Sequence, residues 1–303
     1  MTTRVILDTD IGTDVDDCLA LSVILASPEL QLDGVTCVYG DVALRARIVI
    51  ELLALRGRDD VPVFLGARSP LLGKRPIYWA GHEGQGLLDG GRHRRHPADE
   101  HAVDYIVRHV MTNPGQIHLI AIGPLTNVAL AFLREPGLAK ALAHLTIMGG
   151  VLRGPSRLDT AYAEHNIKCD PEAAHIVLSS GAPMSLVPLD VTLRTVAREA
   201  DLATIRARGD AYHHAVADQL ARYPRFRDTG STFLHDPLAV ASVVRRDVLG
   251  WTRLRVDVEL GGEHAIGATL MRSPTDAAPA NAHVALDLDP ARAERFIVER
   301  LAS

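Results

Sequence analysis

The sequence predicts an open α/β fold, with a mostly parallel central sheet, helices on both faces and antiparallel additions toward the C-terminus. Short aliphatic and β-branched runs alternate along the chain with helix-like segments, and these runs are apolar throughout. Strands of this kind are buried on both faces, as parallel strands covered by helices are. The last third instead contains segments in which apolar and polar residues alternate, which is typical of half-exposed antiparallel strands.

The elements of the first two thirds follow one another as short strands and helix-like segments. Strands are expected at Val5–Leu7, Asp33–Tyr39, Ile117–Ile122, Leu145–Met148 and Met184–Val187. Helix-like segments are expected at Asp17–Ala26, Val42–Arg56 and from Gly123-Pro124 through Phe132. Asp170-Pro171-Glu172 begins another helix, because Asp caps it, Pro suits its first position and Glu favours its positive end. Gly181 is expected to end that helix.

In the last third, strands are expected at Trp251–Leu260, Ile266–Met271 and His283–Leu288, and Asp289-Pro290 opens a terminal helix. The chain has no internal repeat and no low-complexity segment that would act as a linker. We therefore expect residues 1–303 to form one domain.

Bulk composition narrows the function classes. The net charge is −5, with 37 acidic and 32 basic residues, which gives no reason to expect nucleic acid or an anionic membrane as a partner. The three cysteines, Cys18, Cys37 and Cys169, are far apart and form no CxxC pair, so neither a zinc site nor a disulfide framework is expected. No apolar run approaches the ~20 residues that span a bilayer. We expect a soluble cytoplasmic protein.

Polar residues follow the expected strands where ligands bind in parallel sheets, beyond the carboxyl ends. The stretch RVILDTDIGTDVDDCLAL (residues 4–21) places five aspartates between two apolar runs. Helix capping accounts for one or two of them, and a cation that neutralises the cluster accounts for all. Oxygen ligands without nearby histidine or cysteine favour Ca²⁺ or Mg²⁺ over zinc.

The loop also has features of two other kinds of site. An EF-hand loop counted from Asp8 requires Gly at its sixth position and Glu at its twelfth, where Thr13 and Leu19 stand. Asp8-Thr9-Asp10 after a strand is also similar to the nucleophile motif of haloacid-dehalogenase-like Mg²⁺ phosphatases. That motif requires Thr or Val where this chain has Gly12. The phosphatase stays as an alternative.

Three further segments carry candidate chemistry. Leu234–Val240 (LHDPLAV) is either a capped helix start or a proton carrier beside a cation ligand. Glu164 and Asn166 lie two residues apart in the segment that precedes a helix. In an extended chain their side chains would project to the same side and could form paired hydrogen bonds with adjacent hydroxyl groups of a ligand, although a solvated loop would look the same. The Gly-rich run 81–91 lacks dinucleotide-binding spacing, and we interpret it as a mobile lid or a plain surface loop.

Taken together, these motifs resemble the inosine–uridine-preferring nucleoside hydrolase family nearly end to end. The matching segments are DTDIGTDVDDCLAL, GHEGQGL, AIGPLTNVA, IMGG, AEHNIKCDPEAA, LHDPLAVA and NAHVALDLD. The resemblance implies an open α/β fold, a bound Ca²⁺ and hydrolysis of the N-glycosidic bond of ribonucleosides to ribose and free base. A metal-bound water activated by aspartate would attack C1′ through an oxocarbenium-like transition state.

The resemblance also implies roles for individual residues. Asp10 would be both a Ca²⁺ ligand and the general base. Asp17 and Asp236 would be carboxylate ligands, and Thr126 would give its main-chain carbonyl to the metal. His235 would approach the leaving base, to which His suits proton donation near neutral pH.

The substrate would be held by Asp16, Glu164 and Asn166 on the ribose and by residues such as His82 near the base. A homo-oligomer, either dimer or tetramer, is expected. A non-catalytic nucleoside or sugar binder is the third class considered, and the presence of both Asp10 and His235 argues against it.

The chain departs from the family pattern at four places. Ile11 stands where the family has Pro, and the acidic loop is longer, so Asp14 is an additional acid. His165 stands where phenylalanine is usual. The asparagine that binds the 5′ end of the sugar in the family has no counterpart around residues 156–159, so a modified ribonucleoside is also considered as substrate.

Overall fold

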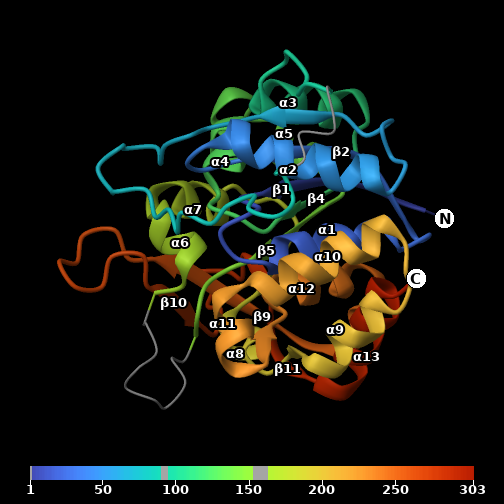
Figure 1. The fold of residues 1–303 in the computed structure, drawn as a ribbon. Helices are drawn as coiled ribbons and strands as arrows, with labels where there is room; N and C mark the ends of the chain where they lie inside the picture. Colours follow the sequence, from blue (N-terminus) through green and yellow to red (C-terminus); the bar gives the residue numbers. More distant parts are fainter. Residues whose placement is uncertain (1, 90–94, 153–162) are drawn as a thin grey trace.

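A computed structural model describes residues 2–89, 95–152 and 163–303, and its centre is a nine-stranded sheet (Figure 1). The strand order is β10-β9-β11-β6-β5-β4-β1-β2-β3. These strands are β1 (Thr3–Thr9), β2 (Leu30–Cys37), β3 (Val63–Leu65), β4 (Ile117–Ala121), β5 (His144–Met148), β6 (Met184–Val187), β9 (Leu249–Val258), β10 (Thr269–Arg272) and β11 (Ala282–Leu288). A separate two-stranded sheet pairs β7 (Val196–Arg198) with β8 (Ser231–Phe233).

Helices cover both faces of the large sheet, as the sequence predicts. They are α1 (Asp16–Leu25), α2 (Val42–Leu55), α3 (Ala102–Thr112), α4 (Thr126–Arg134), α5 (Leu138–Ala141), α6 (His165–Cys169), α7 (Pro171–Leu178), α8 (Leu189–Thr192), α9 (Glu199–Arg206), α10 (Ala211–Arg222), α11 (Pro224–Thr229), α12 (His235–Val244) and α13 (Pro290–Leu301), with a 3-10 turn η1 (Arg246–Val248). None of the helices among the described residues is long and apolar enough to cross a membrane.

Parallel pairing explains why the first strands are apolar throughout. β1 pairs in parallel with β2 on one side and β4 on the other. Successive side chains of a strand point to opposite faces, so Ile6 packs into the core beneath α3 and α4 while Leu7 packs into the core around α1. Both residues are fully buried. A strand in this position has no solvated face, and the alternating polar pattern is therefore absent.

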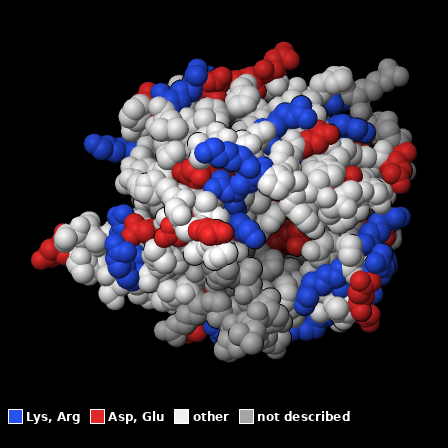
Figure 2. All heavy atoms as spheres, turned by 90° about the vertical axis from the view of Figure 1, so that its left-hand side faces the viewer, with Lys and Arg blue, Asp and Glu red and all other residues white. Residues whose placement is uncertain are grey.

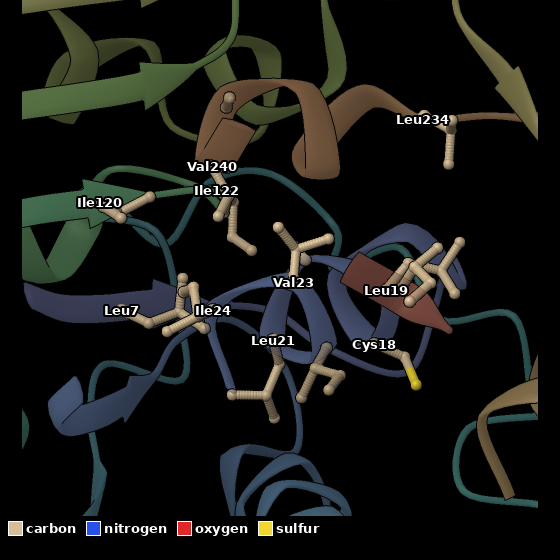
Figure 3. Packing of buried hydrophobic residues seen from close by; sticks show 14 of the residues in the cluster. Leu7, Cys18, Leu19, Leu21, Val23, Ile24, Ile120, Ile122, Leu234 and Val240 are labelled. Atoms are coloured by element: carbon tan, nitrogen blue, oxygen red, sulfur yellow. The ribbon is translucent and has the colours of Figure 1, made fainter. Parts of the chain in front are cut away.

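Helix α1 is the most deeply enclosed helix at the site. Its residues 16–24 are all buried. In Figure 3, Leu21, Val23 and Ile24 of α1 lie among Leu7 of β1, Ile120 of β4 and Val240 of α12. A helix that is apolar on all sides is held by the core rather than by one amphipathic face. The first turn of α1 carries Asp16 and Asp17, so the core sets their position.

The antiparallel additions at the C-terminus are confirmed. β9 pairs antiparallel with both β11 and β10, and β11 joins the main sheet in parallel with β6. The predicted strand 266–271 is displaced, because Gly267 has φ +84° and belongs to the turn before β10. The strand predicted to end at Tyr39 ends at Cys37, because Tyr39 has φ +67°. The assignment of residues 1–303 to one domain stays a prediction.

Candidate active site

The acidic loop begins with Asp8, which supports the site from behind. Asp8 lies within β1 and is fully buried. Its Oδ1 accepts hydrogen bonds from Thr36 Oγ1 (2.6 Å) and Asn127 Nδ2 (2.8 Å), which come from β2 and α4. Burial raises the pKa of Asp8 to about 7. These bonds tie three neighbouring segments together directly below the loop.

Four other carboxylates converge at the sheet edge: Asp10, Asp16, Asp17 and Asp236, none of them more than 7% exposed. One ligand oxygen from each of Asp16, Asp17 and Asp236 lies within 4.8 Å of the others. Thr9 Oγ1 donates a short hydrogen bond to Asp17, and the Asp236 main-chain N–H donates to Asp16 Oδ2 at 3.2 Å. α12 thus brings a carboxylate from the last third of the chain against the first turn of α1.

Without a counterion, the ionised form of these four buried carboxylates costs free energy. Burial raises the pKa of all four carboxyls, and mutual repulsion adds to it: from Asp14 for Asp16, from Asp10 for Asp17 and from Asp16 for Asp236. A divalent cation removes both penalties, since it replaces lost hydration and cancels the repulsion. Buried oxygen donors of this number and spacing fit Ca²⁺ or Mg²⁺.

Arg45 is a site residue that the sequence analysis missed. It is fully buried in α2, and its guanidinium donates to the main-chain oxygens of Asp10, Ile11 (2.8 Å) and Tyr39 (2.6 Å) and to Thr13 Oγ1 (3.2 Å). The Arg45 charge also lowers the pKa of Asp10 against the effect of burial. The only sequence signal is a cation on the buried side of a helix rich in aliphatic residues, VALRARIVIELLAL.

The wall beside the carboxylates differs from the prediction. Glu164 caps α6 and accepts from the N–H groups of Asn166 (2.8 Å), Ile167 (3.1 Å) and Gly150 (3.0 Å). Asn166 lies inside α6 and its Nδ2 donates to Ile122 O at 2.8 Å. The segment is not extended as predicted, because Glu164 caps a separate short helix, α6, that precedes the predicted helix α7. Both side chains still line the cavity.

Thr126 is not brought to the cavity. It is buried at the first position of α4, where its Oγ1 donates to Asp170 Oδ2 at 2.7 Å. A carbonyl at that position faces along the helix toward the N–H four residues later. The structure therefore does not support Thr126 as a source of a metal-ligand carbonyl. Ile122, at the end of β4, lines the cavity instead.

Three histidine side chains lie near the carboxylates that form the floor of the cavity. His235 Nδ1 lies 2.8 Å from Thr192 Oγ1, and burial lowers the pKa of His235 to about 4. His82 Nε2 lies 2.9 Å from Thr13 O. Burial alone would lower the pKa of His165, but its hydrogen bond with Cys169 and the charge of Asp10 outweigh burial and raise the pKa to about 9. All three imidazoles line the cavity.

The additional acid Asp14 reaches to the far wall. Its Oδ2 accepts a hydrogen bond from Tyr223 Oη at 2.7 Å, and its Oδ1 accepts from the Val15 N–H at 2.6 Å. Tyr223 connects α10 with α11. The longer loop therefore has a structural use: it ties the acidic loop to the helices that close the cavity.

Together these groups enclose a cavity of about 690 Å³, within the usual range for small-molecule sites. Figure 2 shows acidic side chains in a hollow near the middle of the face on which α6 lies. Residues 90–91 of the predicted lid and residues 156–159, where the 5′-binding asparagine was sought, lie outside the described residues. Lid mobility stays a prediction.

The inosine-uridine preferring nucleoside hydrolase family model matches residues 5–295, and the chain belongs to this family. It is accordingly an enzyme that hydrolyses N-glycosyl bonds of ribonucleosides. It is 35% identical to the pyrimidine-specific ribonucleoside hydrolase RihA of Enterobacter sp. (strain 638) over 100% of this chain and 98% of that protein. Uridine nucleosidase 1 of Arabidopsis thaliana is 31% identical, covering 88% of this chain and 81% of that protein.

The fold comparison agrees. The structure of a plant nucleoside hydrolase, the PpNRh1 enzyme, matches with a TM-score of 0.88 and 30% identity over 100% of both chains. Family membership confirms the resemblance and removes the phosphatase and non-catalytic alternatives. The predicted cytoplasmic location and homo-oligomer stay predictions.

Proposed function

We propose that this chain hydrolyses ribonucleosides to ribose and free base in a Ca²⁺-dependent reaction. The observation that carries the proposal is the convergence of Asp10, Asp16, Asp17 and Asp236 at the floor of one cavity. A bound cation would stabilise buried carboxylates in such number in their ionised form, and the cavity above them has room for a nucleoside. The family and the names of the relatives support the same reaction.

Asp10, Asp17 and Asp236 would hold the ion. Ca²⁺ suits this set because it accepts about six to eight oxygen ligands in loose geometry, which leaves positions for water and sugar hydroxyls. When bound, the ion would lower the pKa of a water molecule and neutralise the floor. A main-chain ligand, predicted at Thr126, is better sought at Ile122, which lines the cavity.

The side chains divide the remaining work. Asp10 takes a proton from the water that attacks C1′, and the neighbouring carboxylates stabilise the positive charge that develops on the ribosyl group. Asp16, Glu164 and Asn166 hold the ribose hydroxyls. His235 and His82 stand over the floor, where they hydrogen-bond the departing base.

The decisive experiment measures reducing sugar released from uridine, cytidine, inosine, adenosine and guanosine, with Ca²⁺ and after chelation. We expect turnover of at least one ribonucleoside, loss on chelation and recovery with Ca²⁺. The 2′-deoxy form of the best substrate should turn over poorly, because Asp16 and the cation both need the 2′-hydroxyl. Equal turnover of the deoxy form would overturn the assigned sugar contacts.

An Asp10→Asn variant tests whether Asp10 is the general base, because it removes the carboxylate and keeps the size of the side chain. We expect kcat to fall by about 100-fold or more, in line with loss of a general base. Asp99→Asn is the matched control, because Asp99 is exposed and outside the cavity. Full activity in Asp10→Asn would remove Asp10 as the base.

A further inference from the structure

A second cavity lies at the opposite edge of the sheet, where β5, β6 and β11 begin. It has a volume of about 480 Å³, and its polar lining includes His144, Arg253, Arg255 and His283. The catalytic cavity lies beyond the carboxyl ends of the parallel strands, and this one borders their amino ends. The two cavities share no lining residue among the described residues.

Hydrogen bonds hold the polar groups of this edge in place. His144 Nε2 lies 2.8 Å from Ser185 Oγ on the neighbouring strand. Arg246 Nη1 donates to the same Ser185 Oγ at 3.2 Å, and its guanidinium lies 4.4 Å from the centroid of the Trp251 ring. His283 is the register partner of Ser185 in the β11–β6 pair. The groups are therefore preorganised rather than loosely exposed.

The charge at this edge is uncompensated. Arg255 pairs with Asp257 at 2.6 Å, but neither Arg246 nor Arg253 forms an ion pair with a described acidic residue. The charged groups that act on His144 and His283 are all basic, and after burial their repulsion lowers the pKa of both imidazoles. Arg253 is thus the arginine of the cavity lining that has no carboxylate partner among the described residues, and a guanidinium left in this way favours a bound anion.

We propose that this cavity binds a phosphate group, with Arg253 as the charged ligand and with His283, its register partner, and His144 as neighbouring imidazoles. Arg246, which is bonded to Ser185 beside His144, adds positive charge next to the cavity. Guanidinium groups present paired N–H donors that match phosphate oxygens, and imidazole N–H groups add further donors. The ligand is either inorganic phosphate or the phosphate of a small organic ester. The proposal does not depend on the function of the catalytic cavity.

Calorimetric titration of the full chain with inorganic phosphate, ribose 5-phosphate and uridine 5′-monophosphate tests the site. Arg253→Gln should weaken binding by about 10-fold or more, as expected for loss of a charged hydrogen bond. Arg253→Lys keeps the charge and should lose less. Arg295→Gln is the matched control, since Arg295 is exposed on α13 and outside the cavity. Nucleoside turnover should be unchanged in all three variants.

The outcomes are distinct. Comparable binding of all three ligands identifies free phosphate as sufficient, whereas tighter binding of one ester identifies an organic phosphate. Absence of binding to wild type overturns the proposal. Equal binding to wild type and to Arg253→Gln also overturns the proposal, because the ligand then binds at another place, such as the catalytic cavity.

Discussion

At the scale of single residues, the site depends on side chains that do not touch the substrate. Asp10 owes its position to Arg45, which donates to the main-chain oxygens of Asp10 and of the next residue, Ile11. A guanidinium suits this task because its donors point in several fixed directions at once. A buried cation is otherwise costly, so its retention here indicates a positioning role.

Replacing Arg45 tests that role. We expect Arg45→Met to lower kcat/KM by about 10-fold or more and to destabilise the fold by about 2–4 kcal/mol, because several buried carbonyls lose their donor. Arg47→Met on the same helix is the control, since Arg47 is exposed. Steady-state kinetics and urea unfolding measure both effects. Wild-type kinetics in Arg45→Met would show that the loop holds its shape without the guanidinium.

A second residue-scale prediction concerns Asp14 and Tyr223. Loss of their hydrogen bond in Tyr223→Phe should raise KM several-fold, because the wall of the cavity is less well held, and cost about 1 kcal/mol of stability. Asp14→Asn combined with Tyr223→Phe should show a non-additive effect in a double-mutant cycle. Tyr212→Phe, which removes a hydrogen bond to Ser22 away from the cavity, is the control. Additive effects of the two substitutions on KM would show that the hydrogen bond between Tyr223 and Asp14 does not hold the cavity wall.

At the scale of elements, the amino-terminal edge of the sheet makes stability depend on pH. Burial lowers the pKa of His118 in β4 to about 3 and that of His144 in β5 to about 4, below the ordinary value of 6.5. Between those values and pH 6.5 the unfolded chain binds more protons than the folded one. The contribution of these two histidines to the free energy of unfolding therefore rises with pH through this window, by up to about 1.4 kcal/mol per pH unit for each histidine.

Urea unfolding at about pH 5 and about pH 7.5 in phosphate-free buffer measures this slope. We expect the rise in the free energy of unfolding that His118 contributes between the two pH values to be missing from His118→Gln. The buried carboxyls, whose raised pKa acts in the opposite direction, contribute equally to both proteins and cancel in this comparison. His264→Gln, which replaces an exposed histidine outside the named strands, should behave as wild type. An unchanged slope in His118→Gln would contradict the assignment to His118.

At the scale of the whole molecule, the carboxylate cluster links distant parts of the chain. Asp10 follows β1, Asp17 starts α1 and Asp236 starts α12. A cation that binds these groups only in the folded state stabilises the entire fold, by about 2.7 kcal/mol at 100 times its dissociation constant. Removing it restores the repulsion between buried carboxylates.

Thermal unfolding with chelator and with added Ca²⁺ tests this linkage. We expect a Tm lower by several degrees after chelation and recovery with Ca²⁺. In Asp17→Asn combined with Asp236→Asn, added Ca²⁺ should leave Tm unchanged. A wild-type Tm that ignores both chelator and Ca²⁺ would contradict a resident ion.

Much of the fold and site could be predicted from local sequence. Apolar runs specify buried parallel strands, and Asp170 caps α7 as predicted, accepting from the Ala173 N–H at 3.1 Å. The motifs also located the residues that meet in the catalytic cavity, apart from Thr126. The conformation around Glu164 was not predictable, because a glutamate in an extended segment before a helix and one that caps a short helix of its own look alike in sequence.

The strand and helix order, the family and the acidic residues of the floor are evident from the sequence, because these depend on local patterns and spacing. The contacts of Arg45, Asp14 and the basic groups beside His144 become visible only in the folded chain. Their partners come from elements far away in the chain, and side-chain packing across such distances leaves no periodic signal. The same reason explains why the phosphate cavity has no motif of its own.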